Sequence, residues 1–209
     1  MKKFWIILLV IGIIALIGFA AFRWLSNNNT PNQDSVSQYD ATRTSFNNDT
    51  NITQTVPSKT ELYSFSTDIL TESKNRLTNI KITCSRINGT VVKAGKEFSF
   101  CDVVGQPSSK DGYKPADAFG KNNKIIQAIG GGNCQVSTTI YNAVLKVDGL
   151  KVTERHEHDR DVAYIQDGKD ATVAYDYLDL KFKNTNDFDV KLYAFVSDDK
   201  VTVKIFRLA

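Results

Sequence analysis

The sequence predicts an α+β domain, with one or two helices packed on a largely antiparallel sheet, preceded by one transmembrane helix. Three features of the sequence indicate this fold class. The N-terminus carries an uncharged apolar run, two later segments have apolar residues at helical spacing, and the C-terminal part alternates apolar and polar residues. A few helices followed by consecutive strands are typical of α+β proteins.

The first element is a predicted transmembrane signal anchor, residues 1–25. Its apolar run from Phe4 to Phe22 contains no charge, and at about 1.5 Å per residue it matches the thickness of a bilayer core. Two lysines precede the run, and Trp5 and Trp24 flank it, which predicts a cytoplasmic N-terminus and a single-pass protein of the cell membrane whose C-terminal part is extracytoplasmic. The alternative is a cleavable signal peptide, because residues 18–20 offer a small-residue site.

The rest of the chain divides into a linker and a domain. Residues 26–59 are rich in Asn, Ser, Thr and Gln, a composition that predicts a flexible linker because it cannot bury a core. Residues 60–209 have the length of one ordinary domain. The chain has 26 basic and 23 acidic residues and a net charge of +3. The three basic residues of the anchor account for that excess, so we expect no nucleic-acid partner.

Two helices are predicted inside the domain. The segment from Ser73 to Ile87 has apolar residues at helical spacing, and a second helix follows the three glycines Gly130–Gly132, with an apolar face from Val136 to Val147. Strands are predicted at 98–100, 124–129, 152–158, 171–175, 178–182, 190–196 and 201–206.

Cys134 is the candidate nucleophile. It follows Gly131, Gly132 and Asn133 at the predicted start of a helix, where free amide N–H groups and the helix dipole favour the thiolate. The same N–H groups suit an oxyanion, and we count Gln135 as a possible side-chain donor. The alternative is a small buried residue below a tight turn.

Only two histidines are present, His156 and His158. On a strand, residues two apart face the same side, so both imidazoles are candidate bases beside the thiol; two exposed edge-strand histidines are the alternative. Asp170, Asp179 and Asn184 are candidates for the group that orients the base. A zinc site using Cys134 and the histidines is the competing chemistry, but the ligand spacings of known zinc motifs are absent. We therefore expect no metal and no cofactor.

The other two cysteines, Cys84 and Cys101, leave two possibilities open. In an exported protein they can form a disulfide and leave Cys134 as the free thiol. Alternatively, both are buried free cysteines.

Several ordered motifs resemble one known family. They are Gly95–Phe100, Val104–Gly105, Gly112–Tyr113, Gly130–Ala143, Glu154–His158, Gly168–Val173 and Asp179–Asn184. Together, from about Glu61 to Val196, they resemble the VanW family of Gram-positive bacteria, which is named after an accessory protein of glycopeptide-resistance clusters.

The resemblance implies a function. Some VanW domains are L,D-transpeptidases of peptidoglycan, which cross-link tetrapeptide stems with release of D-alanine through a cysteine nucleophile. For this chain, the resemblance implies that Cys134 is the nucleophile and favours His158 over His156 as the base. It also implies that Arg155 binds a carboxylate of the stem peptide. Ser137 and Thr138 belong to the same motif and are candidate substrate contacts. A non-catalytic wall-binding protein and a zinc-dependent peptidase are the alternatives.

Overall fold

The computed structural model describes residues 59–120 and 124–209, which lie in the compact unit Thr53–Ala209. The predicted anchor and nearly all of the predicted linker lie outside these residues. Across the described ranges, no helix has both the length and the apolar character needed to cross a membrane.

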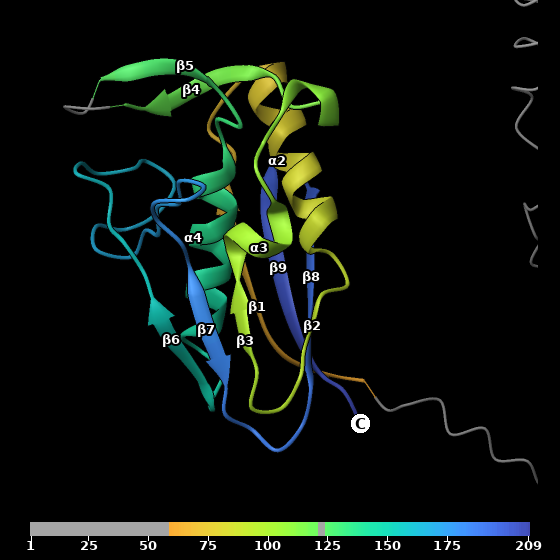
Figure 1. Ribbon diagram of the computed structural model, residues 1–209. Helices are drawn as coiled ribbons and strands as arrows, with labels where there is room; N and C mark the ends of the chain where they lie inside the picture. The colour runs from red at the N-terminus through yellow and green to blue at the C-terminus, as the bar shows by residue number, and fades with distance from the viewer. Residues whose placement is uncertain (1–58, 121–123) are drawn as a thin grey trace, which may run out of the picture. The chain divides into compact units, whose positions relative to one another are not determined.

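The chain order of helices and strands is mixed, with the longest strands at the two ends of the domain (Figure 1). The elements are β1 (Thr60–Asp68), α2 (Lys74–Ile87), β2 (Val91–Val92), β3 (Glu97–Ser99), α3 (Phe100–Val104), a 3-10 turn (Ser109–Asp111), β4 (Pro115–Phe119), β5 (Ile125–Ile129), α4 (Asn133–Val144), β6 (Leu150–Glu154), β7 (Lys181–Asn184), β8 (Val190–Ser197) and β9 (Lys200–Arg207).

The strands form a four-stranded sheet in the order β1-β9-β8-β2, a three-stranded sheet in the order β3-β7-β6, and the hairpin β4-β5. Every strand pair is antiparallel. Helix α4 contacts β1 and β9 of the larger sheet and β6 of the smaller one, and it packs beside α2, which covers β8 (Figure 1). The predicted α+β domain, with few helices on antiparallel sheets, is confirmed.

Short sequence signals explain where the helices begin. The side chain of Ser73 accepts the amide N–H of Arg76 and caps α2, as expected for a serine before an apolar periodic segment. Ser99 ends β3 and caps α3 in the same way. Helix α4 begins after Gly132, whose φ of 118° is accessible to glycine at little cost.

The apolar faces of α2 and α4 meet the larger sheet. Ile80 of α2, Ile140 of α4 and Ile205 of β9 are all fully buried and belong to one hydrophobic cluster. This cluster holds the start of α4 in place beneath the glycine turn.

Some predicted strands are corrected by the structure. The segment 171–175 makes only isolated bridges, His156 with Thr172 and Ala174 with Leu178. Strand β6 ends at Glu154, so the strand predicted over 152–158 stops before both histidines. Strand β7 begins at Lys181, later than predicted. Strands β1, β2 and β4 and helix α3 were not predicted, because their apolar alternation is weak or short.

Candidate active site

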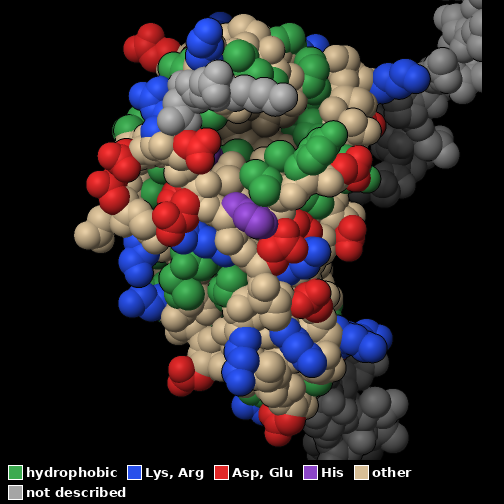
Figure 2. All heavy atoms as spheres, turned by 60° about the vertical axis from the view of Figure 1, so that its left-hand side comes forward, with side chains coloured by type: hydrophobic (Ala, Val, Ile, Leu, Met, Phe, Trp, Pro, Cys, Tyr) green, Lys and Arg blue, Asp and Glu red, His purple; other side chains and the backbone are tan. Residues whose placement is uncertain are grey.

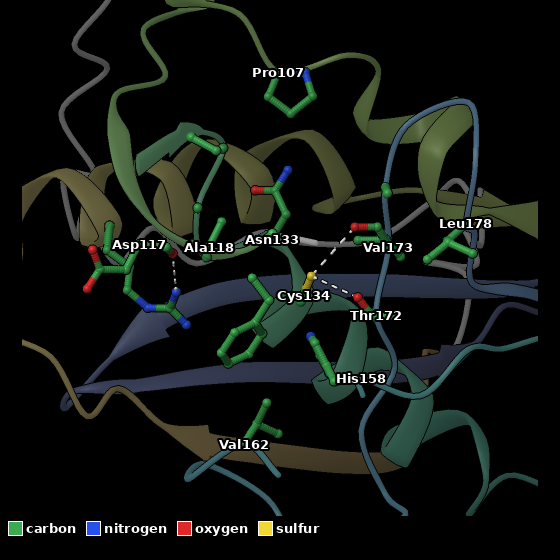
Figure 3. Close-up of a pocket in the computed structure, with 18 of the residues that line it drawn as sticks. Pro107, Asp117, Ala118, Asn133, Cys134, His158, Val162, Thr172, Val173 and Leu178 are labelled. Atoms are coloured by element: carbon green, nitrogen blue, oxygen red, sulfur yellow. Dashed lines mark hydrogen bonds between the residues drawn. The ribbon is translucent and has the colours of Figure 1, made fainter. Parts of the chain in front are cut away.

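Cys134 is the second residue of α4, separated from the three glycines by Asn133 alone. Its Sγ is 3.5 Å from the hydroxyl of Thr172 and 3.6 Å from the carbonyl oxygen of Val173 (Figure 3). The irregular segment that replaces the predicted strand therefore positions the thiol.

His158 lies next to the thiol, and Asp170 binds the His158 ring. The Nδ1 atom of His158 is 2.6 Å from Oδ2 of Asp170, which also accepts the backbone N–H of His158 at 2.7 Å. The His158 side chain is only 4 % exposed, and its ring points toward Cys134 in Figure 3. Because Nδ1 is bound to the carboxylate, Nε2 is the ring nitrogen left for the sulfur.

The pKa values of this group shift together. Burial raises the pKa of the Cys134 thiol, but the hydrogen bond and positive charge of His158 oppose it, and the net pKa is lowered. Burial lowers the pKa of His158, whereas Cys134 and Asp170 raise it, with a net increase. The pKa of Asp170 is lowered, because hydrogen bonds from His158 outweigh burial. The arrangement thus favours a thiolate–imidazolium pair held by a carboxylate.

Arg155 supports the carboxylate. Its Nε donates to the backbone carbonyl of Asp170 at 2.7 Å, and its Nη2 lies 3.1 Å from Oδ1. A further ion pair joins Arg155 to Glu157. The guanidinium expected to bind a stem carboxylate is therefore directed toward carboxylates of the protein itself.

The other candidate bases and orienting groups lie elsewhere. His156 binds Glu154 through Nε2 at 3.0 Å and is 37 % exposed. Asp179 accepts from the Ser99 hydroxyl at 2.6 Å, and Asn184 donates to backbone carbonyls beside β7. Of all these candidates, only His158 meets the thiol, and Asp170 binds the far side of its ring. The expectation that both imidazoles face the same side is wrong, because β6 ends before either histidine.

Three candidate substrate contacts are engaged within the fold. The Gln135 amide donates to the carbonyl of Asp68 at 2.8 Å, away from the thiol. Ser137 donates to the Ala171 carbonyl at 2.6 Å, and Thr138 accepts the Ala171 N–H at 2.9 Å. These side chains fasten α4 to β1 and to the segment that carries Asp170.

The glycine turn is closely packed. A Cβ on Gly131 would lie 2.6 Å from the carbonyl oxygen of Ala116 in β4. Asn79 donates to the Gly131 carbonyl at 2.9 Å, and Asn133 accepts from Thr83 at 2.7 Å. The turn is therefore held from β4 and α2, and it presents the start of α4 in a fixed position.

A cleft of about 780 Å³ opens above the thiol. It is lined by the glycine turn, hairpin β4-β5, and the segments 157–164 and 172–178. Apolar side chains stand at its rim, including Phe119 and Ile125. Figure 2 shows acidic and basic side chains interspersed over this part of the surface, with hydrophobic side chains between them.

All three described cysteines are free, so the disulfide between Cys84 and Cys101 is not present. Burial raises the pKa of the Cys84 thiol to about 12, and burial together with the nearby carboxylate of Asp179 raises the pKa of the Cys101 thiol to about 12. Cys101 lines the same cleft as Cys134 but has no imidazole partner among its interactions. Among the described residues, no three His, Cys, Asp or Glu side chains are grouped as a metal site.

Sequence reasoning missed Thr172, Val173 and Arg76 as parts of this site. The first two follow Asp170 in the chain, but only the fold brings them to the sulfur. Arg76 lies in α2, far from Cys134 in sequence, and it lines the same cleft. Thr172 and Val173 end the motif Gly168–Val173, which gave them no role, and no local pattern marks Arg76.

Comparison with known proteins gives consistent relatives. The YoaR protein of Bacillus subtilis is 39% identical over 112 residues, which cover 54% of this chain and 36% of that protein. The vancomycin B-type resistance protein VanW of Enterococcus faecalis is 27% identical over 140 residues, which cover 64% of this chain and 50% of that protein. The aligned regions thus span half or less of each relative. No solved structure gives a significant match.

A family model described as "VanW like protein" matches residues 75–206. Apart from the first residue of α2 and the last residue of β9, this range includes every element from α2 to β9, the glycine turn, and Cys134, His158 and Asp170. Since the match covers more than half of the chain, the chain belongs to the VanW-like protein family.

Proposed function

We propose that this protein is a cysteine-dependent acyl-transfer enzyme of peptidoglycan, an L,D-transpeptidase that cross-links tetrapeptide stems. The observation that carries the proposal is the arrangement of Cys134, His158 and Asp170. Nδ1 of His158 is 2.6 Å from Asp170, and the ring points toward Cys134 (Figure 3), so that the pKa of each group is displaced toward its ionised form. A nucleophile, a base and an orienting carboxylate are the components of this chemistry.

In the first step, the Cys134 thiolate attacks the carbonyl carbon of the L,D bond in a donor stem. The C–N bond breaks, the imidazolium of His158 gives its proton to the leaving amine, and D-alanine departs from a thioester. The side-chain amine of a diamino acid on a second stem then attacks the thioester. Neutral His158 accepts the proton of that amine, and the thiolate is restored.

The glycine turn supplies candidate oxyanion donors. The backbone N–H groups of Gly132 and Cys134 donate to no acceptor within the part of the chain that the structure describes. Free amide N–H groups at a helix start suit the oxyanion of a tetrahedral intermediate. The cleft volume of about 780 Å³ falls within the range of ligand sites.

The location of the enzyme is part of the proposal. The apolar run of residues 4–22, preceded by two lysines, supports a membrane anchor with the domain on the outer side. The Enterococcus faecalis relative is named for vancomycin resistance, which agrees with a role at the cell wall.

The proposal is tested with the full-length chain and disaccharide-tetrapeptide fragments, read by mass spectrometry. Cross-linked dimers, or D-alanine release alone, are expected from the wild type and not from Cys134→Ala. Cys101→Ala is the matched control, because this second thiol of the cleft lacks an imidazole, and it should retain turnover.

Two outcomes would count against the proposal. Equal stem binding without turnover in wild type and Cys134→Ala would indicate a wall-binding protein. Turnover that survives Cys134→Ala but stops with a chelator would indicate a metal-dependent peptidase.

A further inference from the structure

Arg76 is a cation placed at the nucleophile's end of the cleft. It lies in the first turn of α2 and lines the cleft. Its Cγ is 3.4 Å from the position that a Cβ on Gly132 would occupy. Its Nη2 donates to Oε1 of Gln135 at 3.3 Å, and Gln135 follows Cys134 in the chain. Arg76 therefore binds Gln135 and lies beside Gly132, and these two residues flank Cys134 in the sequence.

The hydrogen-bond partners of Arg76 are neutral and distant. Besides Gln135, its Nη1 reaches the carbonyl oxygen of Asp117 at 3.5 Å. Other arginines of the domain have carboxylate partners: Arg86 pairs with Asp111 at 3.3 Å, and Arg155 with Asp170 at 3.1 Å. Within residues 59–120 and 124–209, no ion pair includes Arg76.

The positive charge of Arg76 affects the pKa of Tyr164, a residue that also lines the cleft. Burial and the Cys134 thiolate raise the pKa of Tyr164, while the charge of Arg76 acts in the opposite direction. The Asp117 side chain accepts from Gln127. In Figure 3, Asp117 and Val173 lie on opposite sides of Cys134, so the carbonyl that Arg76 reaches is on the side away from Thr172 and Val173.

We propose that Arg76 binds a carboxylate of the substrate. In the reaction proposed above, on which this assignment rests, that group is the terminal carboxylate of the departing D-alanine, one residue beyond the attacked carbonyl. A planar guanidinium can hold a carboxylate with two parallel hydrogen bonds. Arg76 then selects stems whose scissile bond precedes the C-terminal residue, whereas the family resemblance placed Arg155 on a stem carboxylate.

A first experiment measures the charge near the thiol without any substrate. Rates of Cys134 alkylation by iodoacetate and by the neutral iodoacetamide are compared in the full-length chain. The ratio of the two rates should fall about three- to ten-fold in Arg76→Gln, the effect of one unit charge several ångströms away, and should be largely kept in Arg76→Lys. Arg86→Gln, on the same helix, is the control. An unchanged ratio in Arg76→Gln would overturn the proposal.

A second experiment measures binding in the inactive Cys134→Ala background. A tetrapeptide stem with a free C-terminal carboxylate should bind about ten-fold more tightly than the same stem with a C-terminal amide, as expected for one charge-assisted interaction. Adding Arg76→Gln should remove this preference, and a preference that persists would sink the assignment.

The two proposals fail separately. If the wild type shows no turnover but the acid-over-amide preference depends on Arg76, the carboxylate site stands and the enzymatic function falls. If turnover is present and Arg76→Gln leaves kcat/KM for the free-acid stem unchanged, the enzymatic function stands and the role of Arg76 falls.

Discussion

His156 and His158 are two positions apart in the chain but lie in different environments. His156 is paired with Glu154 at the surface, whereas His158 is buried between Asp170 and the thiol. The difference arises because β6 ends at Glu154 and the chain then leaves the sheet. Two chemically identical side chains are therefore expected to have separable effects on Cys134.

The first prediction concerns His158→Gln. Burial continues to raise the pKa of the Cys134 thiol, but the opposing imidazole is lost, so the thiol pKa should increase. The alkylation rate by iodoacetamide at neutral pH should fall about ten-fold for each pH unit of that increase. The pH dependence of alkylation measures the shift. His156→Gln should leave the inflection in place, and an equal shift in both variants would contradict the assignment of the base.

The second prediction concerns Asp170→Asn. Removing the carboxylate takes away one cause of the raised pKa of His158, while burial still lowers it, so that pKa should decrease. The imidazolium would then lose its proton at lower pH, and the alkaline limb of the turnover profile should move to lower pH.

NMR titration of the His158 ring measures the same change directly. Asp179→Asn is the matched control, because Asp179 is a buried carboxylate bound to Ser99 instead of an imidazole. A His158 titration that is unaffected by Asp170→Asn would remove Asp170 from the site.

At the scale of elements, the glycine turn before α4 determines where the thiol sits. Gly132 adopts a positive φ, and Gly131 passes within contact distance of the β4 backbone. Three glycines in a row already indicate such a turn in the sequence. Only the structure shows why position 131 has to be glycine: the carbonyl oxygen of Ala116 occupies the space that a Cβ would need.

The third prediction is that Gly131→Ala disturbs the site more than Gly95→Ala. The new Cβ at position 131 would meet rigid backbone at 2.6 Å, whereas at position 95 nothing lies within 4 Å and only the positive φ is strained. Overpacking typically costs about 1–3 kcal/mol, and a left-handed φ costs about 1–2 kcal/mol. Urea unfolding and the iodoacetamide rate are measured together. Only Gly131→Ala should alter the Cys134 alkylation rate, and a normal rate would contradict the packing argument.

At the scale of the whole domain, α4 contacts both larger antiparallel sheets and carries the nucleophile in its first turn, at the cleft. The long sheet pairs the first described strand with the last, β1 with β9. Closing the domain therefore requires contacts between residues more than a hundred positions apart. The site is assembled by the same closure, since α2, α4 and the 157–178 segment all contribute to it.

The fourth prediction compares the same substitution at two places. Ile205→Ala, in the fully buried centre of the larger sheet, should lower the free energy of unfolding by about 2–5 kcal/mol. Ile126→Ala, on the β4-β5 hairpin with 46 % of the residue exposed, should cost much less because little cavity is created. Urea midpoints compare the two, and similar losses would show that the hairpin belongs to the cooperative core.

Much of the fold follows from local patterns. The helical spacing of apolar residues predicted α2 and α4, and the alternation in the C-terminal part predicted β8 and β9 closely. The segment 171–175 alternates equally well but forms no strand. The backbone groups of Ala171 and Val173 bind side chains of α4 instead, and the preceding Asp170 binds His158. The periodicity of the sequence does not encode these contacts.

By itself, the sequence determined the fold class, the likeness to the VanW family and the position of Cys134 at a helix start, because each depends on residues close together in the chain. The family resemblance already favoured His158 over His156, but the tertiary structure alone decided that Asp170, and not Asp179 or Asn184, binds the imidazole that faces the thiol. It also decided that Arg155 supports Asp170 while Arg76 lines the cleft. The physical reason is that hydrogen bonds and charge pairs act over a few ångströms in space, whatever the separation of their residues in the sequence.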